Sequence, residues 1–287
     1  MLSVTQQSRA VRRLDSCGPR GASPSRLSAP SIDVELGLLG GGTRRVPWGE
    51  PWQFLTAAYW IGLTERWIAE HPLGESHGLG KSLVQEVVAC LLGGHGITYE
   101  LNVAAFRALD DSGLVTLARR ASEEHLREVL IAPLHVQGRT VRYRFPNQKA
   151  YRIATALERL RAEEPPEDSL RARDWLMSFS GIGPKTASWI VRNRYPNSNV
   201  AIIDIHVQRA AVRAHVFDPE WLPAKNYWLM ESAFLEWARI GGVPASDLDA
   251  IIWQEQAAAA RRRPAKPNLC HDNSLCSGPN QERCDER

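Results

Sequence analysis

Apolar residues recur at helical spacing along most of the chain after residue 46. The clearest stripe runs from Pro51 to Glu70 and consists of Trp52, Leu55, Tyr59, Leu63 and Trp67. Residues three or four positions apart share one face of a helix, and such a stripe is typical of a helix packed on a core. No alternating apolar and polar pattern is long enough to indicate a strand. The pattern therefore predicts an all-α fold.

Capping signals place further helices along the chain. Ser82-Leu-Val-Gln85 has the form of a capping box, so a helix is expected to start there and to end at Gly93-Gly-His-Gly96. The acidic, proline-broken link Glu163–Asp168 is expected to precede another helix at 169–179. The remaining helical segments are predicted at 102–110, 112–120, 122–131, 226–240 and 246–262.

The two ends of the chain lack this periodicity. Residues 1–46 are rich in Ser, Arg, Gly and Pro and are expected to form a disordered tail, although their arginine content with few acids is also typical of a transit peptide. Residues 47–263 are expected to form one helical domain, and residues 264–287 a flexible tail with three cysteines.

The composition narrows the class of protein. With 44% hydrophobic residues in 287, the chain has enough apolar content for a large buried core. The net charge of +3 is small, so a nucleic-acid surface would have to be a local patch. No run of about eighteen apolar residues occurs, and no membrane span is expected. Five scattered cysteines and the lack of a secretory signal pattern favour an intracellular setting, in the cytoplasm or nucleoid.

The stretch Phe179–Asn193 is predicted to form a hairpin that opens a helix. Gly181 and Gly183 flank one apolar residue, so the backbone there can turn tightly and approach another surface closely. Pro184 fits the first helical position. The amide groups of Ile182, Gly183 and Lys185 would then point outward at the positive end of the helix dipole, which is a site for a phosphate.

Candidate functional residues lie at the end of this hairpin and after it. Lys185 and Trp189 are one helical turn apart and share a face. Asp204 follows the apolar run Val200–Ile203 and precedes a helical pattern, so it is expected to be an N-cap. The ten residues between the two helices are long enough to return Asp204 to Lys185. Lys185 is expected to be buried against Trp189, and burial favours the uncharged form of an amine.

These residues resemble the helix-hairpin-helix DNA glycosylases. The family pattern is Gly-hydrophobic-Gly-x-Lys, then a helix, then Asp-x-His at the start of the next helix. This chain has Gly181-Ile-Gly-Pro-Lys185 within the hairpin 179–185, and Asp204-Ile-His206. The separation of nineteen residues between the lysine and the aspartate is similar to that of the bifunctional 8-oxoguanine DNA glycosylases.

The resemblance implies a two-lobed helical fold with the active site between the lobes. It implies that Lys185 is the nucleophile and Asp204 the essential carboxylate, and that an oxidised purine is removed and the strand then cut through a Schiff base. The implied partner is double-stranded DNA with a damaged base, bound by a monomer. No cofactor is implied apart from a monovalent cation at the hairpin. An iron–sulfur cluster is not expected, because the tail has only Cys270, Cys276 and Cys284.

Several other residues are expected at the DNA. Residues 139–152 carry five positive charges in fourteen positions, interleaved with aromatic residues, which favours a nucleic-acid face. The expected DNA contacts are Gly181, Gly183, His206, Arg144, Lys149 and Gln148. The resemblance implies that Gln148 fills the gap left by the extruded base. Trp189 and, by resemblance, Trp253 are expected in the base pocket, and core burial of either is the alternative. The glycines Gly94 and Gly96 and His95 between them either contact DNA or cap a helix.

Three other functions are compatible with parts of the pattern. The nearest is an endonuclease III-like glycosylase for oxidised pyrimidines. A non-catalytic helix-hairpin-helix module would need the hairpin but not both Lys185 and Asp204. A helical protein-interaction domain would not explain the basic stretch 139–152.

Overall fold

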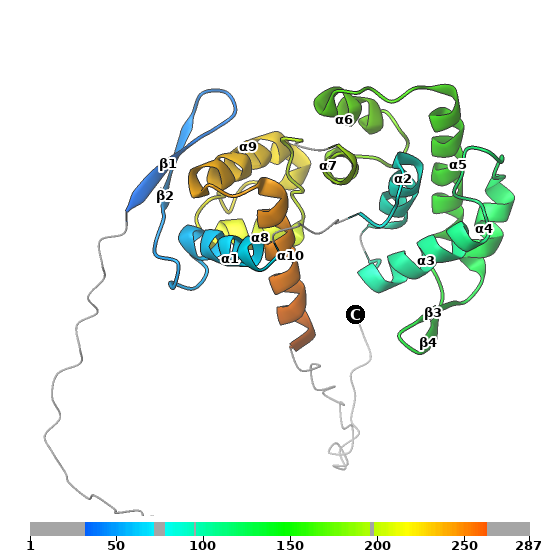
Figure 1. Cartoon of the computed structure of the whole chain (residues 1–287), viewed down its shortest axis with the longest axis horizontal. Helices are drawn as coiled ribbons and strands as arrows, with labels where there is room; N and C mark the ends of the chain where they lie inside the picture. The colour runs from blue at the N-terminus through cyan, green and yellow to red at the C-terminus, as the bar shows by residue number, and fades with distance from the viewer. Residues whose placement is uncertain (1–31, 72–77, 95, 196–197, 263–287) are drawn as a thin grey trace, which may run out of the picture. The chain divides into compact units, whose positions relative to one another are not determined.

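The computed structural model describes residues 32–71, 78–94, 96–195 and 198–262. Within these residues it contains ten α-helices and four short β-strands, so the predicted helical class is confirmed (Figure 1). The elements are β1 (Asp33–Gly37), β2 (Thr43–Pro47), α1 (Ala57–Glu70), α2 (Leu83–Leu92), α3 (Tyr99–Asp111), α4 (Glu123–Ile131), β3 (Leu134–Val136), β4 (Arg139–Val141), α5 (Pro146–Ala162), α6 (Ser169–Met177), α7 (Pro184–Arg194), α8 (Ile205–Arg213), α9 (Pro223–Gly241) and α10 (Ala245–Arg262).

The helices begin where the sequence supplies a cap. Six of them follow a side chain that accepts a backbone N–H of the first turn, which otherwise lacks an acceptor. These caps are Thr56, Ser82, Thr98, Ser122, Asp168 and Asp204. The helices α5, α7 and α9 begin with a proline instead, which has no N–H to satisfy.

One hydrophobic core is formed by helices α2 to α7. The helix α2 is its centre, because every residue from Val87 to Leu92 is buried and α2 contacts both α5 and α7. The helix α7 turns Ala187, Ile190 and Val191 into this core. The hairpin that precedes α7 is therefore fixed to a rigid element.

A second hydrophobic core is formed by β1, β2, α1, α8, α9 and α10. Its largest fully buried side chains are Trp60, Phe217, Phe234 and Trp237. The helices α1 and α10 are far apart in the sequence but lie in contact (Figure 1). At the end of α9 a Cβ on Gly241 would lie 2.2 Å from Ile61 Cδ1, so this close approach of α9 to α1 requires glycine.

The prediction of a disordered tail over residues 1–46 is wrong for residues 33–46. These residues belong to an antiparallel hairpin of β1 and β2, in which Val34 pairs with Val46 and Leu36 with Arg44. Leu36 and Val46 are fully buried in the second core. Each strand is too short to show an alternating pattern. Residues 1–31 and the tail 264–287 lie outside the described residues, and so do their cysteines and His95.

Two further predictions about the helices are wrong. The stripe Trp52–Trp67 does not form one helix, because Thr56 caps α1 and the preceding residues form turns; Trp52 is 78% exposed. The segment 112–120 consists of turns and bends instead of a helix. The strands β3 and β4 were also not predicted, and β4 lies inside the basic stretch.

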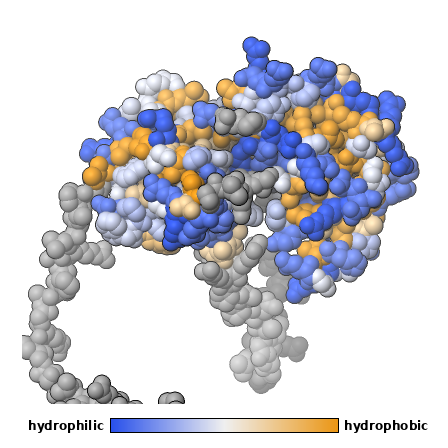
Figure 2. All heavy atoms as spheres, viewed as in Figure 1, coloured by the Kyte–Doolittle hydropathy of each residue, from blue (hydrophilic) through white to orange (hydrophobic). Residues whose placement is uncertain are grey.

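The visible surface is mostly hydrophilic, with apolar patches between the charged residues (Figure 2). Among the described residues, no helix has both the length and the apolar character that crossing a membrane requires.

Candidate active site

The hairpin before α7 forms as predicted, with one difference between its two glycines. Phe179 and Ile182 are buried, and the Ile182 N–H donates to the Phe179 carbonyl at 3.1 Å. Gly181 has φ +85° and makes the turn. Gly183 is the N-cap of α7 with extended backbone, so it does not take part in the turn through a positive φ. A Cβ on Gly183 would meet nothing within 4 Å, which leaves its backbone open to an approaching phosphate.

The amide donors of the hairpin are also fewer than predicted. The Ile182 N–H is already bonded within the turn, whereas the N–H of exposed Gly183 has no acceptor among the described residues. The helix dipole of α7 adds partial positive charge at the same place. The site for an anion therefore consists of Gly183 and the first turn of α7.

Lys185 lies on the first turn of α7 and lines a cavity of about 320 Å³. Ile203, which precedes Asp204, lines the same cavity. The structure therefore brings the lysine and the end of the segment that carries the aspartate to one place. The Lys185 side chain is exposed, so the predicted burial against Trp189 is wrong for the free chain.

Asp204 is the N-cap of α8, as predicted. One of its carboxylate oxygens, Oδ1, accepts the backbone N–H groups of His206 and Val207, both at 2.8 Å. These two bonds fix the orientation of the carboxylate. Among the ion pairs of the described residues, none joins Asp204 to Lys185, so the second carboxylate oxygen has no lysine partner there.

Trp189 is half-buried against the first core, one turn beyond Lys185. A Cβ on Gly93 would lie 3.6 Å from its Cζ3 atom, so the indole packs along the backbone where α2 ends. A half-buried indole at this point is compatible with both interpretations, a pocket wall and a packing residue.

Trp253, on α10, is half-buried and lies among other aromatic rings. Its ring meets Tyr99 edge-to-face at 5.6 Å between centroids, and His206 lies 6.5 Å away at a similar angle. The helices α3, α8 and α10 thus meet at Trp253. The roles of Trp253 and His206 toward DNA stay predictions.

Lys149 does not face the DNA, and this prediction is wrong. Its side chain is 7% exposed, and its Nζ donates to the carbonyl oxygens of Leu91 and Gly93. Tyr143 donates to the Leu92 carbonyl at 2.5 Å. The last carbonyls of a helix have no intrahelical donors, so these two residues complete the end of α2. Burial, and the nearby positive charge of Arg152, lower the pKa of Lys149 to about 8.

Replacing Lys149 with methionine is expected to lower the free energy of unfolding by roughly 1–3 kcal/mol, because two buried carbonyls lose their donor. The pKa of Lys149 is lower in the folded than in the unfolded chain. The wild type therefore gains stability relative to the variant as the pH rises from about 8 to about 10.5, where an unfolded lysine loses its proton. Urea unfolding of both proteins across this range measures the difference, with exposed Lys81→Met as the control. A pH-independent difference would contradict this assignment.

The other predicted residues of the basic stretch are exposed. Gln148 lies in the first turn of α5, and the Arg144 guanidinium lies over the Phe145 ring at 5.0 Å. A Cβ on Gly96 would lie 2.5 Å from Arg144 Nη1, so Arg144 also covers the loop after α2. Both side chains are exposed, and their contact with DNA stays a prediction.

A family model described as 8-oxoguanine DNA glycosylase matches residues 67–242, which is more than half of the chain. The matched region includes the hairpin, Lys185 and Asp204. The chain belongs to the 8-oxoguanine DNA glycosylase family. The resemblance inferred from the motifs is thereby confirmed.

Curated relatives of this family member are named 8-oxoguanine DNA glycosylase/AP lyase. One from Fusobacterium nucleatum is 30% identical over 88 residues, which is 30% of this chain and 41% of that protein. One from Saccharolobus solfataricus is 34% identical over 130 residues, 43% of this chain and 56% of that protein. The chain thus spans about half the length of the curated relatives it matches.

The solved 8-oxoguanine DNA glycosylase of Methanocaldococcus jannaschii has a similar fold. It matches with a TM-score of 0.52 and 23% identity, covering 70% of this chain and 94% of the other. At this identity the match supports the fold alone. It agrees with the helical helix-hairpin-helix architecture of the family.

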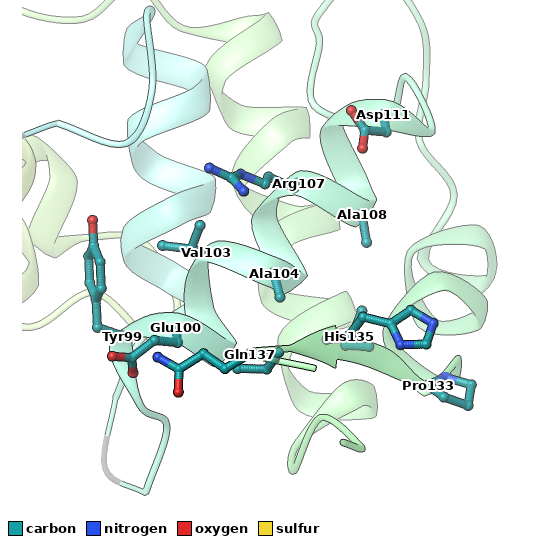
Figure 3. A pocket seen from close by; sticks show the side chains of 12 residues that line it. Tyr99, Glu100, Val103, Ala104, Arg107, Ala108, Asp111, Pro133, His135 and Gln137 are labelled. Carbon is teal, nitrogen blue, oxygen red and sulfur yellow. The ribbon is translucent and has the colours of Figure 1, made fainter. Parts of the chain in front are cut away.

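A second hollow lies away from this site, between α3 and the strand β3 (Figure 3). Its volume is about 480 Å³, and Arg107, Asp111 and His135 are among its lining residues. None of the predicted site residues lines it. The cavity beside Lys185 is therefore the candidate active site because of the residues that line it, although the hollow at α3 and β3 has the larger volume.

Sequence reasoning missed three residues next to the site. Tyr227, Glu231 and Asp249 are buried, and each bonds to the backbone before Asp204. For the two acids, the sequence offered one signal, which is an acid among apolar residues of a predicted helix. It occurs in Leu229-Met-Glu-Ser-Ala233 and in Leu248-Asp-Ala-Ile251. Nothing local in the sequence indicates which groups these acids meet.

Proposed function

We propose that this family member removes 8-oxoguanine from double-stranded DNA and then cleaves the strand at the resulting site. The observation that carries the proposal is the arrangement at the start of α7: an exposed Lys185 beside the open Gly183 backbone, in one cavity with the segment that ends at Asp204. This combines a site for a DNA phosphate, a nucleophile and a fixed carboxylate.

In the proposed reaction the damaged nucleotide is extruded from the duplex toward Lys185. Breaking its glycosidic bond leaves positive charge on the sugar, which the Asp204 carboxylate stabilises. The uncharged Lys185 amine forms a bond to C1′ as the base leaves with the bond electrons. The attached nitrogen then loses a proton and the C1′–O4′ bond breaks, with O4′ taking up a proton, which opens the sugar ring to a protonated Schiff base. This Schiff base loses a proton from C2′, and the C3′–O3′ bond breaks so that the 3′ phosphate departs, which cuts the strand.

Because Lys185 is exposed in the free chain, bound DNA would have to form one wall of the site. In the free chain the lysine is open to water, so the surface that would bury it and favour the uncharged amine is the bound DNA itself. The proposed site residues all come from one chain, and we propose that a monomer acts on the duplex.

Strand cleavage of oligonucleotide duplexes, each with a single lesion, tests the proposal. Cleavage at 8-oxoguanine in preference to an oxidised pyrimidine is the expected result. Binding without cleavage of any lesion would instead indicate a non-catalytic helix-hairpin-helix module.

Replacing Trp189 with alanine is expected to slow excision of 8-oxoguanine by roughly ten- to a hundredfold, because stacking is worth about 1–3 kcal/mol per base. Cleavage at a pre-formed abasic site has no base to stack and should change much less. Single-turnover rates on both substrates measure the effect. The matched control is Trp221→Ala, which removes a half-buried tryptophan of the second core. Equal losses on the two substrates, with a lower melting temperature, would make Trp189 a packing residue.

A further inference from the structure

The segment 200–203, which precedes Asp204, is hydrogen-bonded by side chains from other elements. Residues 200–203 are buried but belong to no helix or strand, so their backbone groups need other partners. Three side chains from α9 and α10 provide them. The Ala201 N–H donates to Glu231 Oε1 at 3.0 Å, the Ile202 N–H to Asp249 Oδ2 at 3.4 Å and the Ile203 N–H to the Tyr227 hydroxyl at 3.4 Å, while that hydroxyl donates to the Ala201 carbonyl at 3.0 Å.

The two carboxylates also reach the helix that carries Lys185. Asp249 pairs with Arg192 of α7, and Glu231 lies 3.5 Å from the Ser188 hydroxyl of α7. Lys185, Ser188 and Arg192 are three and four positions apart, so they share one face of α7. Each carboxylate therefore has one bond to the segment before Asp204 and one contact with the helix of Lys185.

We infer that Glu231 and Asp249 are positioning residues that set the separation of Lys185 and Asp204. The inference rests on the proposed function of those two residues. Neither carboxylate is placed to touch the DNA, because both residues are almost completely buried, at 5% and 2% exposure. Their effect on the reaction passes through α7 and the segment 200–203.

The use of charged groups supports a positional role. A buried ion pair is weak evidence for stability, because desolvation offsets most of its attraction. Burial raises the pKa of Glu231, although Arg173 at 2.7 Å and the Ala201 N–H favour its charged form. The carboxylates instead fix orientation, because each accepts from more than one element. Asp249 uses one oxygen for Arg192 of α7 and the other for the Ile202 N–H. Glu231 accepts from Ala201 and Ser188 with Oε1, and both of its oxygens bind Arg173 of α6. Together the pairs connect a helix of the first core with a segment of the second.

The test uses the full chain with Asp249→Asn and Glu231→Gln, which keep the size of each side chain but remove its charge. Ser188→Ala is a milder variant that leaves no charge unpaired. Single-turnover excision and the dissociation constant for a duplex with 8-oxoguanine are measured well below each melting temperature. Hydrogen exchange reports on the Ala201 and Ile202 amides. The control is Asp218→Asn, which breaks the ion pair with Arg44 away from the site.

Excision is expected to fall at least about tenfold in both charge-removing variants, with less than about a threefold change in the dissociation constant and faster exchange at Ala201 and Ile202. The control should keep its rate. Rates within about twofold of wild type would overturn the inference, as would parallel losses of rate and binding that recover on cooling. An inactive wild type would refute the proposed function separately. In that case, unchanged hydrogen exchange at the amides of residues 201 and 202 in the variants would also overturn the inference that Glu231 and Asp249 hold this segment.

Discussion

Replacing Lys185 with glutamine is expected to abolish the covalent protein–DNA adduct that borohydride traps during turnover on an 8-oxoguanine duplex. Strand cleavage should fall by about a thousandfold or more, because glutamine keeps the length of the side chain but has no nucleophilic amine. Denaturing gels of the trapped reaction and single-turnover rates measure the two effects. Lys185 is exposed, so the variant is expected to keep its melting temperature.

The matched control for this experiment is Lys225→Gln. Lys225 lines the same cavity as Lys185 and carries the same charge, but it lies at the start of α9 and not in the first turn of α7. This variant should still form the adduct. An adduct that persists without Lys185 but disappears without Lys225 would transfer the nucleophile to Lys225.

Replacing Asp204 with asparagine is expected to slow excision by roughly a hundredfold or more while the affinity for the lesion duplex is kept. The asparagine oxygen can still accept the His206 and Val207 amides, so α8 keeps its cap. The neutral amide, however, cannot stabilise the positive charge that develops on the sugar. Single-turnover excision, a binding titration and a thermal melt on the same variant separate these effects.

The control for the cap is Asp168→Asn, because Asp168 caps α6 in the same manner and bonds the Arg171 amide at 2.8 Å. That variant should excise at the wild-type rate. If Asp204→Asn lost stability and activity together while Asp168→Asn lost neither, Asp204 would be a structural cap only.

The parts of the site that could be predicted from the sequence depend on local signals. Gly181 makes a turn because of its own φ, Pro184 starts α7 because it needs no acceptor, and Asp204 bonds amides two and three residues away. Each of these features is determined within a few positions. The hairpin and the N-cap were therefore predicted correctly before any tertiary contact was known.

The parts that were mispredicted depend on distant partners. Lys149 looks like the rest of the basic stretch, but carbonyls more than fifty residues earlier determine that it is buried. Leu36 and Val46 are too few to form a pattern, and they become core residues only because β1 and β2 pair with each other and pack on other elements. Trp52 continues a helical period that the Thr56 cap interrupts. The spacing of apolar residues along the sequence cannot show which of these residues are buried and which are exposed.

The composition of the second core determines where the chain can be cut. The family match begins at residue 67, inside α1, and ends at residue 242, before α10. A fragment limited to the match would lose Leu36, Val46 and Trp60, and at its other end Leu248 and Ile252, all of which are buried. It would also lose Asp249 and expose Trp237, whose indole donates to the Ala57 carbonyl. The smallest fragment that retains both cores therefore extends from the start of β1 to the end of α10.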